Sequence, residues 1–146
     1  MKSRIAVLCI ALIVTLMSAQ AYARNTINYF PVDDVLNEPG FASQISGVSF
    51  YFGNQAHPAV VQKFGEYRTN KKTNAFNKSD LEACNWVFKS AILALHQRAI
   101  SLGANAVVNI RSNYKNNVES SETEFTCGAG ALMSGVALIG DFVKIE

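Results

Sequence analysis

A capped helix over residues 80–102 restricts the folds that this chain of 146 residues can adopt. Ser79 and Glu82 have the S-x-x-E spacing of a capping box, and Gly103 stands where helices commonly end in a left-handed residue. Apolar residues at three- and four-residue steps predict one buried stripe, which comprises Leu81, Cys84, Phe88, Ala91, Ile92, Leu95, Ala99 and Leu102. The side chain of Cys84 is therefore expected to face the core.

A second set of apolar residues makes the nonpolar surface of this helix wider than half of its circumference. The set comprises Ala83, Trp86, Val87, Leu93, Ala94 and Ile100. We expect one side of the helix to pack on a β-sheet and another side to pack on a second neighbour. That neighbour is either the N-terminal segment or another subunit.

Five stretches have the residue patterns of β-strands. Aromatic and β-branched residues, or alternation of polar and apolar residues, predict strands over residues 48–52, 60–69, 106–114, 122–129 and 136–145. Residues 24–46 contain Pro31, Pro39 and Gly40 and are expected to be irregular, apart from a helical turn over residues 33–36. The order β-β-α-β-β-β predicts an α+β fold, in which an antiparallel or mixed sheet of four to five strands packs against one long helix.

The first 23 residues have the pattern of a cleaved signal peptide. Lys2 and Arg4 precede an apolar run from Ile5 to Met17, and Ala21-Tyr22-Ala23 is an A-x-A cleavage site. The alternative is an uncleaved membrane anchor, but a helix over this run extends only about 20 Å, whereas a hydrocarbon core is about 30 Å thick. We therefore expect cleavage after Ala23, a periplasmic or secreted protein with no stable membrane span, and one α+β domain over residues 24–146.

The predicted mature chain is electrically neutral. The full sequence has 13 lysines and arginines and 11 acidic residues, and removal of Lys2 and Arg4 balances the two signs. A neutral domain lacks the long-range attraction to phosphates that nucleic-acid-binding proteins use. We therefore expect no nucleic acid among the partners of this protein.

Export changes the expected chemistry of the remaining cysteines. Cys84 and Cys127 are the only cysteines after residue 23, and an oxidising compartment favours a disulfide between them. Closing the loop between these two positions would stabilise the fold by about 4 kcal/mol. Two free buried thiols and a two-cysteine metal site are the alternatives, although no C-x-x-C spacing favours zinc.

The sequence contains no recognisable catalytic or metal-binding motif. H-x-x-x-H, H-E-x-x-H and C-x-x-C spacings are absent, as is the G-x-S-x-G pattern of a serine nucleophile. We therefore expect no catalytic residue, no metal ligand and no cofactor. The rival hypothesis is an enzyme or metal-binding protein whose site assembles from distant residues such as His57, Glu66, His96 and Arg111.

Two further stretches attract a functional interpretation. Gly128, Gly130 and Gly135 lack the spacing of a nucleotide loop and are expected to permit a bulge or close packing in a hairpin. Basic residues are concentrated between Lys63 and Lys78, which we interpret as a solvated loop, with contact to an anionic glycan or a lipid head group as the functional alternative. The expected ligand surface combines Tyr51 of the aromatic strand with Tyr67, Arg68, Lys71 and Lys72 of this basic stretch.

Several stretches resemble a family of small exported bacterial proteins of unknown function. They are residues 51–54, 64–67, 69–76, 84–86 and 99–108, which read YFGN, FGEY, TNKKTNAF, CNW and AISLGANAVV. This resemblance covers most of the predicted mature chain. Members of that family often carry the label of an excinuclease ATPase subunit. The present sequence does not support that label, because it has no Walker A loop, no zinc modules and an export signal.

Residues 102–108, which read LGANAVV, are more distantly similar to YbjQ-like domains and to the stress-sensor lipoprotein of the Rcs pathway. The resemblance implies a compact β-α-β sheet domain, often oligomeric in the YbjQ-like domains and held by disulfides in the lipoprotein. This sequence has no lipobox and has two mature cysteines instead of four. Outer-membrane anchoring and signalling are therefore not implied, and no ligand set supports metal binding.

Together these features predict a periplasmic, non-enzymatic binding or interaction module with an envelope-related role. Its partner would be a protein or an envelope ligand that the sequence does not identify, and the wide apolar surface of the helix is compatible with a homo-oligomer. A metal-binding protein and a small oligomeric structural protein are the alternatives.

Overall fold

The structure, a computed structural model, describes residues 24–146. The predicted signal peptide lies outside the described residues. In chain order the elements are β1 (Asn25–Pro31), α2 (Val32–Leu36), α3 (Pro39–Gln44), β2 (Ser49–Phe52), β3 (Val60–Asn74), α4 (Asp80–Leu102), β4 (Ala106–Ser112), the 3-10 helix η1 (Tyr114–Asn116), β5 (Glu124–Gly130) and β6 (Met133–Ile145). The predicted α+β class is confirmed.

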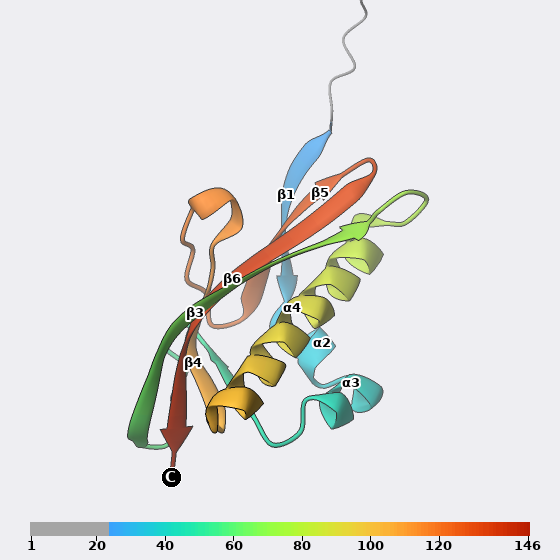
Figure 1. The fold of residues 1–146 in the computed structure, drawn as a ribbon. Coiled ribbons are helices and arrows are strands. Elements are labelled where there is room, and N and C mark those ends of the chain that lie inside the picture. The colour runs from blue at the N-terminus through green and yellow to red at the C-terminus, as the bar shows by residue number, and fades with distance from the viewer. Residues whose placement is uncertain (1–23) are drawn as a thin grey trace, which may run out of the picture.

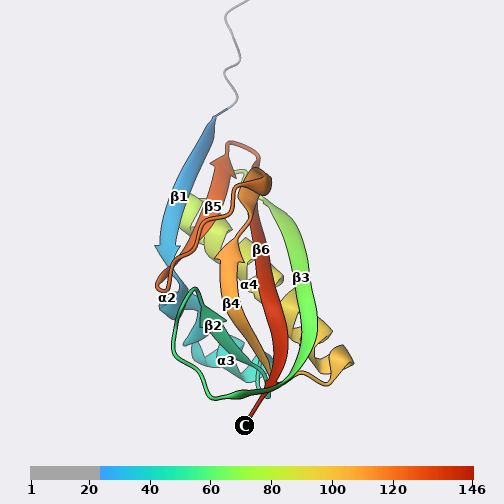
Figure 2. The same cartoon turned by 90° about the vertical axis from the view of Figure 1, so that its left-hand side faces the viewer.

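The strands form a six-stranded mixed sheet in which β6 is the central strand. β3 pairs with one side of β6, whereas β5 and β4 pair with successive parts of its other side and are followed by β1 and β2. The pairing of β2 with β4 is parallel, and the other pairings are antiparallel. Helix α4 covers one face of the sheet, and we call the opposite face the outer face (Figure 1, Figure 2).

Helix α4 has the predicted bounds and caps. The Ser79 hydroxyl accepts a hydrogen bond from the Glu82 backbone N–H at 3.1 Å, and Gly103 ends the helix with a φ of 77°. Towards the sheet, Phe88 stacks on Phe125 of β5 with ring centroids 3.9 Å apart. None of the helices within residues 24–146 has both the length and the apolar character that a membrane crossing requires.

The apolar residues of α4 are not all buried. Ala83 and Val87 of the second set lie in the core, whereas Trp86 is 64% exposed and Ile100 is 56% exposed. Leu81, which we expected in the buried stripe, is 51% exposed. Leu81 is three residues before the buried Cys84, as the stripe requires, but it lies in the first turn of the helix, outside the buried core.

The second neighbour of α4 is the N-terminal segment, one of the two expected alternatives. Phe41 of α3 is buried in the same apolar cluster as the core residues of α4. Lys89 of α4 forms an ion pair with Glu38, and its ammonium lies 5.8 Å from the centroid of the Phe41 ring. These contacts attach the segment before β2 to the side of the helix.

The expectation that residues 24–46 are irregular is wrong. Residues 25–31 form β1, which pairs antiparallel with β5 from Asn25 opposite Gly130 to Pro31 opposite Glu124. The predicted helical turn over residues 33–36 is confirmed as α2, and α3 follows it. β1 escaped prediction because it is an edge strand, where asparagines and a terminal proline are tolerated and the usual strand pattern is weak.

The interpretation of the basic stretch as a loop is also wrong. β3 continues to Asn74 and pairs with β6 in unbroken register from Gly65 opposite Phe142 to Asn74 opposite Met133. Its other edge carries no strand among residues 24–146. Lysine and arginine on such an edge discourage pairing with a further chain, which is a physical reason for a basic strand at this position.

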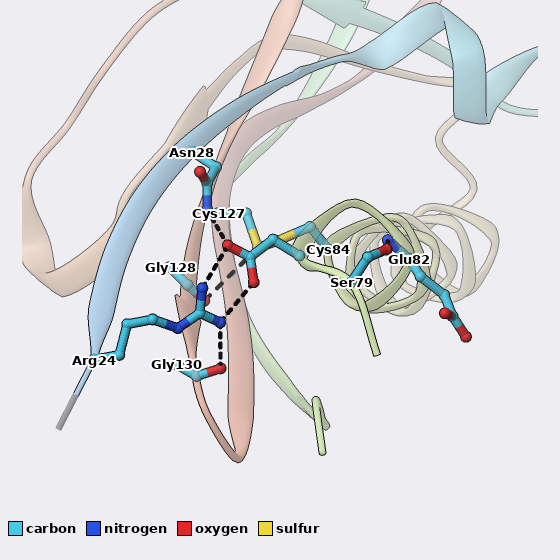
Figure 3. The surroundings of a disulfide bond; sticks show 9 residues. Arg24, Asn28, Ser79, Glu82, Cys84, Cys127, Gly128 and Gly130 are labelled. Atoms are coloured by element: carbon cyan, nitrogen blue, oxygen red, sulfur yellow. Dashed lines mark hydrogen bonds and ion pairs between the residues drawn. A yellow bond between two sulfur atoms is a disulfide. The ribbon is translucent and has the colours of Figure 1, made fainter. Parts of the chain in front are cut away.

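The predicted disulfide between Cys84 and Cys127 is confirmed. It joins the second turn of α4 to β5 with a Cα–Cα distance of 5.9 Å, and both residues are fully buried. Figure 3 shows the two sulfur atoms meeting between the helix and the strand, beside the side chain of Arg24. The bond therefore fixes the start of the helix against the sheet.

Candidate functional site

Strand alternation divides the predicted ligand surface between the two faces of the sheet. Tyr67 lies on the helix side, where its ring meets Phe142 edge to face at 5.1 Å and the Arg98 guanidinium at 4.9 Å. Lys71 follows the same alternation as Tyr67 and is paired with Val136 of the core. Arg68 and Lys72 point to the outer face.

Tyr51 also lies on the outer face, but far along the sheet from Lys72. It is half-buried against a small apolar cluster formed by Ala106, Val108, Val143 and Ile145. Its ring centroid is 5.5 Å from that of His57, in the loop that leads to β3. Tyr51 therefore contributes to the packing of this second cluster, and the predicted five-residue surface is not one continuous site.

Two residues of η1 complete a different site on the outer face. Tyr114 and Lys115 follow β4 and fold back over β5 and β6. Arg68 and Lys115 line a polar hollow of about 290 Å³ together with Asn70, Asn113 and Asn116. Lys72 and Tyr114 line a second, more apolar hollow of about 520 Å³, whose far end is formed by the β5–β6 turn. We call Arg68, Lys72 and Lys115 the cationic row.

A pair of glycines makes room for Tyr114. Gly128 of β5 and Gly135 of β6 are cross-strand partners. A Cβ atom at Gly128 would lie 2.0 Å from the Tyr114 hydroxyl oxygen, and one at Gly135 would lie 3.4 Å from Cε2 of the same ring. The expectation that these glycines permit close packing is confirmed. They leave room for the Tyr114 ring, which forms a wall of the second hollow.

Hydrogen-bond donors dominate the surface around the cationic row. Arg68, Lys72 and Lys115 form no ion pair among residues 24–146. The side-chain amides of Asn70, Asn113 and Asn116 form no hydrogen bond within the same residues; these three side chains line the first hollow. The surface therefore offers charged and neutral donors to a ligand rather than to the protein.

The acidic residues of the outer face are engaged elsewhere. Glu66 accepts a hydrogen bond from Arg111 at 2.8 Å, and Asp141 accepts one from the Asn109 amide at 3.1 Å. Glu119 accepts hydrogen bonds from Tyr29 and from Thr126 on the flank formed by β1 and β5. The charge of Glu119 raises the pKa of the Tyr29 hydroxyl above its ordinary value. Glu66 lies two residues from Arg68 on the same face of β3, but its carboxylate is already paired with Arg111.

The residues of the rival hypothesis do not gather at one point. Arg111 and Glu66 form an ion pair, and His57 lines the same outer groove of about 460 Å³ as Glu66. His96 lies on α4, where its Nε2 is 3.0 Å from the carbonyl oxygen of Ser46. The described part of the chain contains no group of three or more His, Cys, Asp or Glu side chains that could hold a metal ion.

Arg24 and Asp80 form an ion pair beside the second hollow. Arg24 Nη2 lies 2.7 Å from Asp80 Oδ1 and also donates to the carbonyl oxygen of Gly130 at 3.1 Å (Figure 3). The guanidinium holds the pKa of Asp80 below its ordinary value of 3.8, with a further contribution from the amide of Asn28. This pair ties the start of β1 to the start of α4 and to the β5–β6 hairpin.

Comparisons with family models, with curated proteins and with solved structures give no match to this chain. The resemblance to small exported bacterial proteins therefore stays a prediction. The functional argument depends on the geometry of the outer face alone.

Proposed function

We propose that the protein is an exported, non-enzymatic binding module that takes an anionic carbohydrate on the outer face of its sheet. The ligand lies along the cationic row, with its acidic groups at Arg68, Lys72 and Lys115. Its hydroxyl groups accept hydrogen bonds from the asparagine amides of the first hollow. The apolar side of one sugar ring contacts Tyr114 in the second hollow.

One observation carries this proposal: the site offers unpaired hydrogen-bond donors, and the carboxylates near it are already paired. Three cations and three amides surround the two hollows, and the nearby carboxylates of Glu66 and Glu119 are bonded to other residues. A ligand that complements such a surface is rich in acceptors and negatively charged. A glycan that carries carboxylate, sulfate or phosphate groups has this chemistry and also has an apolar ring face for the tyrosine.

Binding of dextran sulfate and of unsubstituted dextran to the purified protein tests the proposal. We expect measurable binding of dextran sulfate by isothermal titration calorimetry, weaker binding as salt is added, and no binding of dextran. Replacement of Arg68, Lys72 and Lys115 by glutamine should raise the Kd about tenfold, because exposed charge pairs contribute roughly 0.5 kcal/mol each.

The control is a neighbour in the sequence that lies on the other face. Lys71→Gln removes the same charge as Lys72→Gln from the next position of β3 and should leave the Kd unchanged. Equal losses in Lys71→Gln and Lys72→Gln would show that net charge alone governs binding, which contradicts a site on the outer face. Equal affinity for dextran and dextran sulfate would contradict the anionic ligand.

A further inference from the structure

The end of the molecule that carries the β5–β6 turn exposes four large apolar side chains. Leu132 is 62% exposed, Phe76 58%, Leu81 51% and Met133 49%. They come from the β5–β6 turn, the connection between β3 and α4, and the first turn of the helix. We call these four residues the apolar tip. Soluble proteins seldom gather so many large apolar side chains at one exposed place unless it contacts a partner.

The apolar tip is a built structure rather than a set of loose loops. The Ala75 backbone N–H donates to the carbonyl oxygen of Leu132 at 2.8 Å and joins the two connections. The Asn74 side-chain oxygen accepts a hydrogen bond from the Phe76 backbone N–H at 2.8 Å. These bonds hold the backbone around Phe76 and Leu132 so that both side chains remain at the surface.

Positive charge surrounds the apolar tip. Lys71 and Lys72 lie at the end of β3, and Lys78 lies between Phe76 and the helix. These lysines form no ion pair among residues 24–146. The first turn of α4 carries two acids, Asp80 and Glu82: Arg24 neutralises Asp80, and the three lysines outnumber the single charge of Glu82. The tip therefore combines exposed apolar side chains with a rim of uncompensated cations, the combination that favours the interface of an anionic bilayer.

The chain enters the fold at this same end. The start of β1 and the β5–β6 turn lie together at the upper end of both views (Figure 1, Figure 2). Arg24, the first described residue, lines the same hollow as Leu132 and Met133. The residue that follows the predicted cleavage site therefore lies at the same end of the fold as the apolar tip.

We infer that the apolar tip is a docking surface for anionic lipid bilayers. Phe76, Leu81, Leu132 and Met133 enter the boundary between head groups and acyl chains, and the lysine rim contacts the lipid phosphates. Docking in this orientation leaves the cationic row on the side of the molecule, accessible to a ligand. The two surfaces share Lys72, Leu132 and Met133, which line the second hollow. Phe76, Leu81 and Lys78 line neither hollow, so variants at these positions test the inference independently of the proposed function.

Co-sedimentation with phosphatidylcholine vesicles, with and without phosphatidylglycerol, tests the inference. We expect binding to the vesicles that contain phosphatidylglycerol and little binding to pure phosphatidylcholine. Phe76→Ser with Leu81→Ser should weaken this binding about tenfold, because the transferred apolar area is lost. Lys78→Gln should weaken it roughly fivefold, the effect of one lysine near an anionic surface. Neither variant changes a residue that lines either hollow, so dextran sulfate binding should be preserved.

Ile100→Ser provides the matched control, because Ile100 is 56% exposed at the opposite end of α4. It should bind vesicles like the unmodified protein. Absence of binding to anionic vesicles would overturn the inference. Equal binding to pure phosphatidylcholine, or an equal loss in Ile100→Ser and in the tip variant, would also overturn it.

A fluorescence measurement locates the contact independently of affinity. Trp86 is the only tryptophan, so Trp86→Phe gives a background in which a new tryptophan reports its own surroundings. Leu132→Trp in that background should shift its emission to the blue on addition of anionic vesicles and should be quenched by brominated lipids. Ile100→Trp should show neither change. The same response at both positions would refute docking through the tip.

Discussion

Tyr114 and Gly128 share one volume, so the side chain at one position depends on the absence of a side chain at the other. The glycine pair sits in a strand conformation that any residue could adopt, and the reason for glycine there is the ring above it. Tyr114 in turn forms the wall of the hollow that we assign to a sugar ring. Gly128 of β5 and Gly135 of β6 therefore determine whether Tyr114 can occupy the position at which it contacts the proposed ligand.

Gly128→Ala tests this dependence. The new Cβ atom should expel the Tyr114 ring from its place and lower the free energy of unfolding by about 1–2 kcal/mol, at the low end of overpacking effects because the ring tip is free to swing into solvent. In a Tyr114→Ala background the same change should cost almost nothing. Urea denaturation of the two single variants and the double variant gives the coupling energy. Strict additivity would contradict the contact.

The charge of Asp80 makes the stability of the fold depend on pH. Because Arg24 lowers the pKa of Asp80 in the folded state, the unfolded chain takes up this proton at a higher pH than the folded chain. The stabilising contribution is therefore present above the ordinary value of 3.8 and is lost as the pH falls through the lower folded pKa.

Asp80→Asn should consequently lower stability at neutral pH, and the difference from the unmodified protein should disappear in strong acid. Arg24→Gln should give the same pH dependence, because it removes the other partner of the pair. Chemical denaturation across the acidic range measures both. A difference that stays constant with pH would show that the ion pair does not cause the pKa shift.

At the scale of elements, the disulfide links the two components of the core. It joins α4 to β5 across 43 residues of sequence, at a place where both sulfur atoms are fully buried. The bond restricts the unfolded chain, and its loss also leaves polar or mismatched groups in the core. The start of α4 depends on it more than the end, which is held by the left-handed Gly103.

Cys84→Ser and Cys127→Ser should each lower the free energy of unfolding by roughly 2–5 kcal/mol. The double variant should lose little more than either single variant, because one substitution already removes the bond. Denaturation with and without reductant measures the effect, and reductant should leave the variants unchanged. Additive losses in the double variant would indicate that each side chain acts by packing alone.

The accuracy of the sequence predictions differs between elements for physical reasons. Helix α4 was predicted to the residue because its caps are local: Ser79, Glu82 and Gly103 act within one turn of the helix ends. β1 was missed because an edge strand gains its stability from a distant partner, β5, rather than from its own residue pattern. The basic half of β3 also lacks a strand pattern, because it is an edge strand that depends on its pairing with β6.

At the scale of the whole molecule, the candidate site combines residues that the sequence separates widely. Arg68 and Lys72 were recognised as ligand-binding candidates, because their charge is visible in the sequence. Tyr114 and Lys115 were missed, because only the return of η1 over the sheet brings them beside β3. The local signal was the glycine pair, which indicated close packing without indicating the residue that packs there.

The central strand of the sheet also follows all of its partner strands in chain order. β6 is the shared partner of β3, β4 and β5, so these strands have no common template until residues 133–145 have left the ribosome. Contacts of such long sequence separation form slowly. The order of synthesis thus makes β3, β4 and β5 wait for their shared partner, so the sheet cannot close before β6 has been made.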